Sequence, residues 1–174
     1  GDVYKRQGYN KVAARVVGTT SGNWYSTFTI DKGSNDGIEK DMNVIAGGGL
    51  VGIITEVGPN YAQIKTVIED NSYVSGMLID TGDTCIVKGD IELMDTGLIH
   101  LSGFANSVTV RNGDKIVTSN ISDKYLPGIL IGYIDSISTS SNNLTKSGTV
   151  TPAVDFSHLD EVLVVMEQKQ QTGD

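Results

Sequence analysis

The feature that most constrains this fold is a succession of short β-type segments with no helical segment between them. Each segment is rich in Val, Ile, Thr or Tyr and is bounded by Gly, Asn, Asp or Ser, which is typical of strands that end in turns. No stretch of about 12 residues keeps the 3.6-residue apolar period of an amphipathic helix. Many short strands without crossover helices predict an all-β protein with little helix.

These segments predict about a dozen strands and two short helical turns. We expect strands over 12–17, 27–31, 43–46, 50–57, 62–68, 74–79, 84–88, 98–101, 115–118, 129–137, 149–153 and 161–166. We expect single helical turns over 37–41 and 155–159, the second capped by Asp155. Asn112-Gly113, between two of the predicted strands, indicates a hairpin.

The charge distribution and the strand count together favour two domains. Residues 1–70 carry 7 basic and 8 acidic side chains, whereas residues 71–174 carry 6 basic and 13 acidic side chains. We therefore expect two small β-barrels in tandem, the first over 9–72 and the second over 73–169. Strand 161–166 either closes the second barrel or returns to the first. Residues 1–8 are interpreted as an assembly remnant, and residues 170–174 as a tail.

Composition excludes several classes of function. The chain has 13 basic and 21 acidic residues, a net charge of −8, which repels phosphate backbones and argues against nucleic acid as a partner. Its single cysteine, Cys85, cannot form an internal disulfide and is predicted to be a buried structural thiol. His100 and His158 lie far apart, so no metal site is predicted, and no cofactor either. The sequence contains no run of about 18 apolar residues, so it predicts no transmembrane helix.

Two short motifs resemble ligand-binding loops, but turns explain both better. Gly47-Gly-Gly-Leu-Val-Gly52 has the spacing of a dinucleotide-binding loop, yet strand-like residues follow it where a helix is required. The segment that begins at Asp31 resembles a calcium loop, but Asp36 and Met42 stand where an EF-hand needs Gly and Glu.

Two functions from other classes remain as alternatives. A chymotrypsin-like hydrolase on a double barrel would need a Ser in a loop that builds an oxyanion hole, and no such loop and no catalytic constellation is found. A peptidoglycan- or carbohydrate-binding module usually presents clustered aromatic residues. Aromatics are 6% here, and Trp24-Tyr25 is the one adjacent pair, for which packing in a core or turn is expected.

Some predicted strands are apolar on both faces, which means that both faces are covered. They are 50–54, 129–131 and 162–165. One interpretation is an interface between the two domains. The other is a docking surface for a partner chain, whose candidate contacts are Leu130, Ile131, Val162 and Val164.

Several segments, in order along the chain, resemble the rod shape-determining protein MreC family from about Tyr9 to Met166. The longer ones are Gly113-Asp-Lys-Ile-Val-Thr-Ser-Asn120, Tyr125-Leu-Pro-Gly-Ile-Leu-Ile-Gly132, Val150-Thr-Pro-Ala-Val-Asp-Phe156 and Leu159-Asp-Glu-Val-Leu-Val164. The shorter ones are Ile30-Asp-Lys-Gly33, Asp36-Gly37 and Gly49-Leu-Val-Gly52. The family's usual Thr-Ser-Gly is Thr118-Ser119-Asn120 here, and Asn tolerates a left-handed backbone as Gly does. The resemblance assigns structural roles to Gly113, Asp114, Thr118, Ser119, Pro127, Gly128, Gly132 and Pro152.

The resemblance implies two β-barrels and a scaffold without catalysis. Such a scaffold self-associates, binds and activates a class B penicillin-binding protein, and reaches MreD and MreB through other parts of the protein. The family's cytoplasmic tail, transmembrane helix and coiled coil are not found in this sequence. The resemblance therefore implies the extracytoplasmic part of a membrane-anchored protein that maintains rod cell shape.

Overall fold

The computed structural model describes residues 9–19 and 27–169, and in this part of the chain it contains twelve strands, three short 3-10 turns and no α-helix. The strands are β1 (Lys11–Thr19), β2 (Thr27–Ile30), β3 (Asn43–Ala46), β4 (Gly49–Val57), β5 (Ala62–Thr66), β6 (Tyr73–Leu78), β7 (Thr84–Lys88), β8 (Ile99–Ala105), β9 (Lys115–Thr118), β10 (Leu130–Thr139), β11 (Thr145–Pro152) and β12 (Glu161–Val165). The turns are η2 (Ser34–Asp36), η3 (Met94–Thr96) and η4 (Phe156–His158).

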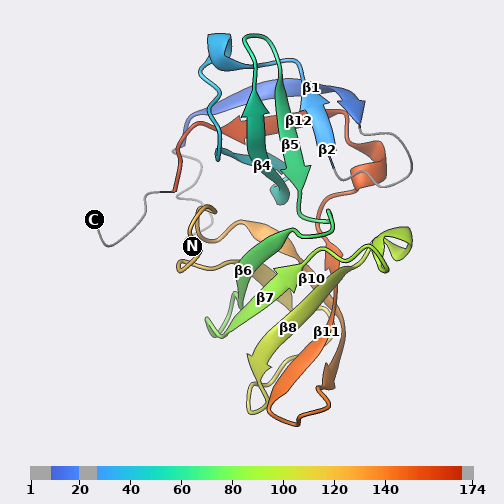
Figure 1. The fold of residues 1–174 in the computed structure, drawn as a ribbon. Coiled ribbons are helices and arrows are strands. Elements are labelled where there is room, and N and C mark those ends of the chain that lie inside the picture. The colour runs from blue at the N-terminus through green and yellow to red at the C-terminus, as the bar shows by residue number, and fades with distance from the viewer. Residues whose placement is uncertain (1–8, 20–26, 170–174) are drawn as a thin grey trace.

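The strands form two closed rings, one above the other in Figure 1. The first barrel has the order β4-β3-β12-β1-β2-β5 and closes where β5 pairs with β4. The second barrel has the order β11-β8-β7-β6-β9-β10 and closes where β10 pairs with β11. Closure removes the unpaired edges that an open sheet would expose. The all-β fold of two small barrels with little helix is confirmed.

The last strand joins the first barrel. β12 lies antiparallel between β1 and β3, with Leu163 opposite Ala13 on one side and Ile45 on the other. The chain therefore leaves the second barrel after β11 and returns to the first, so that the first barrel contains strands from both ends of the described chain.

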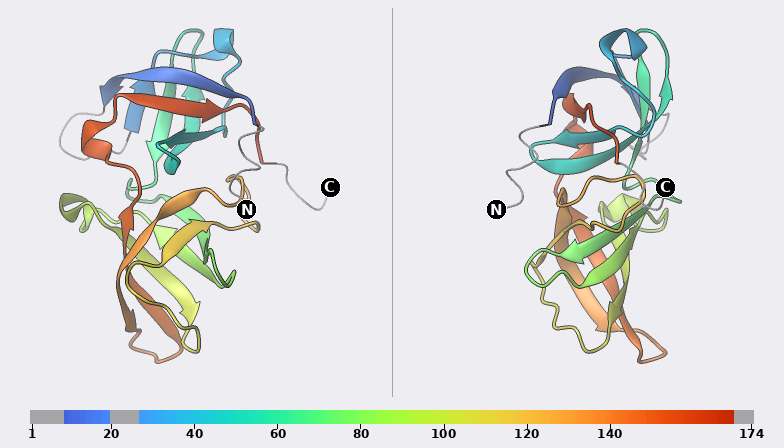
Figure 2. Two further views of the ribbon diagram at one scale, coloured as in Figure 1. Left: turned by 180° about the vertical axis from the view of Figure 1, so that it is seen from behind. Right: turned by 90° about the vertical axis from the view of Figure 1, so that its left-hand side faces the viewer.

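Two crossovers join the barrels on one side, and a loop meets the first barrel on the other. Residues 67–72 run from β5 to β6, and residues 153–160 run from β11 to β12. Figures 1 and 2 show both crossovers on one side of the junction. The β9–β10 loop, residues 119–129, lies on the opposite side, near the end of β12.

Burial alternates along most strands, as a barrel wall requires, but β4 departs from this pattern. Its residues from Gly49 to Ile54 are buried on both faces, because the start of the strand lies at the junction. A Cβ at Gly49 would lie 2.9 Å from the Cβ of Ala153 and 3.0 Å from Val154 Cγ2, both on a crossover. Glycine is required there by close packing.

The prediction that Ile131, Val162 and Val164 form a docking surface is wrong. Their exposed fractions are 0%, 2% and 0%, so all three side chains belong to the core. The exposed residues of β12 are Glu161 and Leu163, and Leu163 is 37% exposed. Every residue of 162–165 is apolar, so the sequence pattern does not indicate which of these side chains point out of the barrel. The fourth candidate, Leu130, is half-buried beside Gly49 at the junction.

Candidate functional site

Gly113 and Asp114 close a turn, but not the hairpin that was predicted. The β8 and β9 strands that flank the turn do not pair, because β9 pairs with β6 and β10. The Asp114 carboxylate accepts the backbone N–H of Arg111 at 2.9 Å, and Gly113, with φ at 91°, donates its N–H to the Ile134 carbonyl at 2.7 Å. The turn thus packs on β10.

Thr118 organises the β9–β10 loop from within. It is fully buried, and its Oγ1 donates to the Leu126 carbonyl at 2.6 Å while it accepts the N–H of Ile129 at 2.8 Å. Gly128, with φ at 80°, donates its N–H to the Thr118 carbonyl at 2.8 Å. Pro127 before a Gly with positive φ suits a type II turn, as the residue types indicate. One threonine therefore brings the two ends of the loop together.

Ser119 fixes the start of the same loop to β6. Its Oγ lies 2.8 Å from Ser75 Oγ, its N–H donates to the Ser75 carbonyl at 3.0 Å, and its Oγ also accepts the N–H of Ile121 at 3.3 Å. The serine hydroxyl is therefore occupied by structural hydrogen bonds and is buried.

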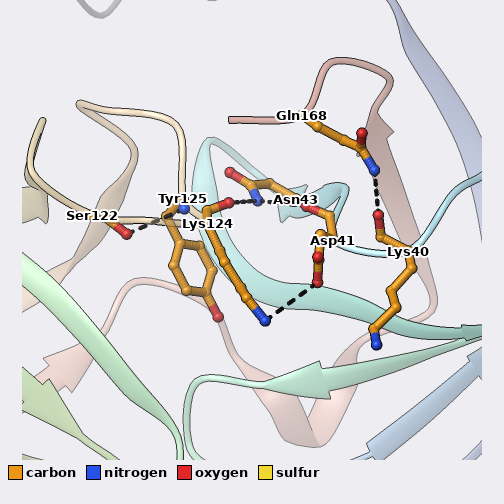
Figure 3. A network of polar contacts seen from close by, with 7 residues as sticks. All are labelled: Lys40, Asp41, Asn43, Ser122, Lys124, Tyr125 and Gln168. Carbon is orange, nitrogen blue, oxygen red and sulfur yellow. Dashed lines mark hydrogen bonds and ion pairs between the residues drawn. The ribbon is translucent and has the colours of Figure 1, made fainter. Parts of the chain in front are cut away.

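The first barrel holds this loop through Asn43 at the start of β3 (Figure 3). The Asn43 side chain is fully buried, its Oδ1 accepts the N–H of Leu126 at 2.8 Å, and its Nδ2 donates to the Lys124 carbonyl at 3.0 Å. A side chain of one barrel thus supplies the hydrogen bonds that the backbone of the other barrel needs. Sequence reasoning missed Asn43, although a lone Asn at the head of an apolar run was a possible signal.

Polar contacts at the rim surround the Asn43 contact. Lys124 Nζ lies 3.8 Å from an Asp41 carboxylate oxygen, and the side chains are 55% and 38% exposed. Beyond β12, the Gln168 amide donates to the Lys40 carbonyl, as Figure 3 shows. Lys169 Nζ donates to the carbonyl of Asn120 in the loop at 3.0 Å. Exposed pairs of this kind contribute little to stability.

Gly132 and Pro152 lie opposite each other in the β10–β11 pair, next to the second crossover. A Cβ at Gly132 would lie 2.1 Å from the Thr151 carbonyl oxygen, so only glycine lets the two strands approach this closely. The sequence-predicted structural residues therefore lie in the turn before β9, the β9–β10 loop and the β10–β11 contact.

Burial shifts the pKa of several groups near the core. It raises the pKa of the Tyr125 phenol beside Asn43, and the negative charge of Asp41 adds to that shift. Burial also raises the pKa of the Cys85 thiol to about 12, so the thiol stays protonated as predicted for a structural cysteine. Glu69, on the first crossover, has a raised pKa for the same reason. In all three groups burial disfavours the charged form.

Asp155, Ser157 and His158 meet at η4, but not in the geometry of a catalytic triad. Ser157 Oγ donates to Asp155 Oδ1 at 2.6 Å and lies 2.9 Å from His158 Nδ1, which is itself 2.8 Å from Asp155 Oδ2. A triad needs Ser and Asp on opposite ring nitrogens, whereas here both contact Nδ1. The predicted cap is confirmed, since the Asp155 carboxylate accepts the Ser157 N–H at 3.1 Å. His100 lies elsewhere, on β8.

Two grooves flank the second crossover. One, of about 950 Å³, is lined by acidic residues that include Asp31, Asp160 and Glu161, with Arg15 beside them. The other, of about 550 Å³, lies between η3 and the crossover. Within the described residues no group of three or more His, Cys, Asp or Glu side chains is arranged to hold a metal ion.

The two loops that resemble ligand-binding motifs are turns, as predicted. Asp31 accepts the Arg15 N–H at 2.9 Å, and Asp36 accepts the Gly33 N–H at 3.1 Å, so both carboxylates of the calcium-like segment have backbone partners. The glycines at 47–49 connect β3 to β4, so a strand follows them where a dinucleotide-binding loop would need a helix.

Trp24-Tyr25 and segments 1–8 and 170–174 lie outside the described residues. No helix in residues 9–19 and 27–169 has the length and apolar character to cross a membrane.

Comparison with known families gives one match that spans both barrels. The family described as "Rod shape-determining protein MreC, barrel core" matches residues 16–166. A relative from Listeria monocytogenes, the cell shape-determining protein MreC, is 28% identical over 159 residues, which cover 90% of this chain and 54% of the relative. This chain thus spans about half the length of that relative.

Solved structures of similar fold carry the same family name. MreC of Listeria monocytogenes superposes with a TM-score of 0.83 at 29% identity, covering 95% of this chain and 79% of that one. A periplasmic domain described as part of the "cell shape-determining filament MreC" gives 0.73 at 23% identity, covering 90% and 95%. MreC in a complex with penicillin-binding protein PBP2 from Helicobacter pylori gives 0.67 at 12% identity, covering 91% and 100%.

Proposed function

The chain belongs to the MreC family, and from that premise we propose that it is a non-enzymatic scaffold of the machinery that maintains rod cell shape. It acts at the extracytoplasmic face of the bacterial membrane, where it self-associates and binds and activates a class B penicillin-binding protein. Contacts with MreD and MreB are made through regions of the longer relatives that this chain does not cover. The observation that carries the proposal is the family match across both barrels, residues 16–166.

Relatives of the same fold support the proposed partners. One solved MreC is described as a complex with PBP2, and another as a domain of a filament. Ser157 and Asp155 both contact the same ring nitrogen of His158, which supports a scaffold over a hydrolase.

The outer face of β12 is the surface we propose for a partner. Leu163 is 37% exposed, and its cross-strand neighbours on the same face are Ala13 of β1 and Ile45 of β3. Ala13 is exposed and Ile45 is partly buried, so the three side chains form an apolar strip across the outside of the first barrel. An apolar contact of this kind depends little on salt.

The test is binding to a purified class B penicillin-binding protein, measured by surface plasmon resonance. We expect specific binding that weakens only modestly between low and physiological salt. Leu163→Asp should weaken binding by about tenfold or more, because the new carboxylate would be buried in the apolar interface without a partner. Leu144→Asp is the matched control, because Leu144 is 71% exposed and lies in the β10–β11 loop, far from β12.

Two results would contradict this surface. They are equal affinities for wild type and a folded Leu163→Asp variant, and an affinity that falls tenfold or more with added salt. Absence of any binding to class B proteins would contradict the proposed partner. Activation is tested by the rate at which a fluorescent penicillin acylates the enzyme, which should rise when the chain is added.

A further inference from the structure

We propose that the two barrels form a hinged pair, closed by a latch in which Asn43 of the first barrel holds the β9–β10 loop of the second. The hinge is the pair of covalent crossovers, 67–72 and 153–160. The β9–β10 loop lies across the junction from them, as Figure 1 and the left view of Figure 2 show. When the Asn43 contact is broken, the two barrels can therefore rotate apart about the crossovers.

Strand pairing does little to keep the junction closed. Among the described residues, the strands of the two barrels pair at a single parallel bridge between Leu130 and Gly49. Within each barrel, by contrast, the strands pair in antiparallel ladders over several residues. Opening the junction therefore breaks no strand ladder within either barrel. Such an opening is a local event, separate from global unfolding.

Asn43 supplies the buried polar contact that favours the closed state. In that state its amide pairs with the Leu126 N–H at 2.8 Å and the Lys124 carbonyl at 3.0 Å, and it is itself fully buried. If the amide is deleted, two backbone groups stay unpaired at the closed junction, whereas water pairs them when the junction opens. Deletion therefore shifts the population towards the open state.

The rim contacts play a smaller part. The Lys124–Asp41 pair spans 3.8 Å and is largely exposed, so solvent and salt screen it. The Lys169 contact with Asn120 lies in a part of the chain that is exposed on the loop side. Because these contacts lie at the rim, they hold the junction less tightly than the buried amide of Asn43 does.

The first test measures the distance between the two barrels. Spin labels at Glu56→Cys and Ser138→Cys mark the far ends of β4 and β10, where both side chains are exposed. We expect one narrow distance distribution for the labelled wild type, and a broader one with a second population for Asn43→Leu. The matched control is Asn60→Leu, because Asn60 is exposed at the β4–β5 turn and contacts Asn35 there. A folded Asn43→Leu variant with the wild-type distribution would overturn the proposal.

The second test needs no variant at the latch. Native-state hydrogen exchange of the wild type reports the free energy at which each amide opens. We expect the Leu126 amide to exchange roughly tenfold or more faster than the core amides of β8 and β10, since the latch opens without unfolding. If Leu126 exchanges only at the rate of those core amides, there is no separate opening and the proposal fails. Thr118→Val removes the hydroxyl that donates to the Leu126 carbonyl, and it should speed the exchange of the Leu126 amide further.

Discussion

Asn43 and Thr118 hold opposite ends of one residue, Leu126. Asn43 Oδ1 accepts the Leu126 N–H at 2.8 Å, and Thr118 Oγ1 donates to the Leu126 carbonyl at 2.6 Å. Asn43 belongs to the first barrel and Thr118 to the second, and both side chains are fully buried. The position of the loop is therefore set from both barrels, and a change in either side chain should be measurable.

Thr118→Val should lower the free energy of unfolding by about 1–3 kcal/mol, because valine has the same shape but leaves two buried backbone groups without their partner. Guanidinium denaturation followed by circular dichroism measures the change. Thr109→Val is the control, since Thr109 is exposed. Equal midpoints for wild type and Thr118→Val would show that the hydroxyl contributes nothing.

Gly128→Ala should destabilise the protein by about 1–2 kcal/mol, because Gly128 has φ at 80° and a side chain strains a left-handed backbone. The control is Gly18→Ala, where a new Cβ would meet Thr29 Cβ at an ordinary 3.9 Å. Thermal unfolding of the two variants side by side measures the difference. If Gly18→Ala costs as much as Gly128→Ala, backbone conformation is not the cause.

Much of the fold could be predicted because its signals are local. Each predicted strand overlaps an observed one, since β-branched runs and the turns that end them both lie within a few residues. The cap of η4 by Asp155 was predicted for the same reason. The predicted helical turn over 37–41 is wrong, because the helical turn in this region is η2, Ser34–Asp36, which ends before residue 37.

The junction could not be predicted because its contacts are distant in sequence. Asn43 and Leu126 are 83 residues apart, and no local pattern marks either as a partner of the other. The outward side of β12 was assigned wrongly because Val162, Leu163 and Val164 are all apolar, so only the pairing with β1 and β3 shows which one faces solvent. The Asn112-Gly113 turn carried a hairpin signal, but its flanking strands pair elsewhere.

Cys85 should react very slowly with Ellman's reagent in the folded protein. Burial raises its thiol pKa to about 12, so little thiolate is present near neutral pH. The side chain is also only 2% exposed, so the reagent cannot reach the sulfur. Unfolding in guanidinium should restore rapid reaction. In a Ser138→Cys variant, one exposed thiol should react at once and one should remain protected. Rapid reaction of wild-type Cys85 under native conditions would contradict its burial.

Asp155 should titrate below its ordinary pKa of 3.8, because the Ser157 hydroxyl and then His158 stabilise its carboxylate. A lowered pKa in the folded state means that the native protein binds this proton less readily than the unfolded chain does. Any stability it gives η4 is therefore complete above pH 3.8 and is lost as the pH falls through the lower folded value. Nuclear magnetic resonance titration of the Asp155 carboxyl carbon measures the pKa directly. Ser157→Ala should move it back towards 3.8, while Ser107→Ala, at an exposed site on the second barrel, should leave it unchanged. An Asp155 pKa that does not respond to Ser157→Ala would show that the Ser157 hydroxyl is not the cause of the shift.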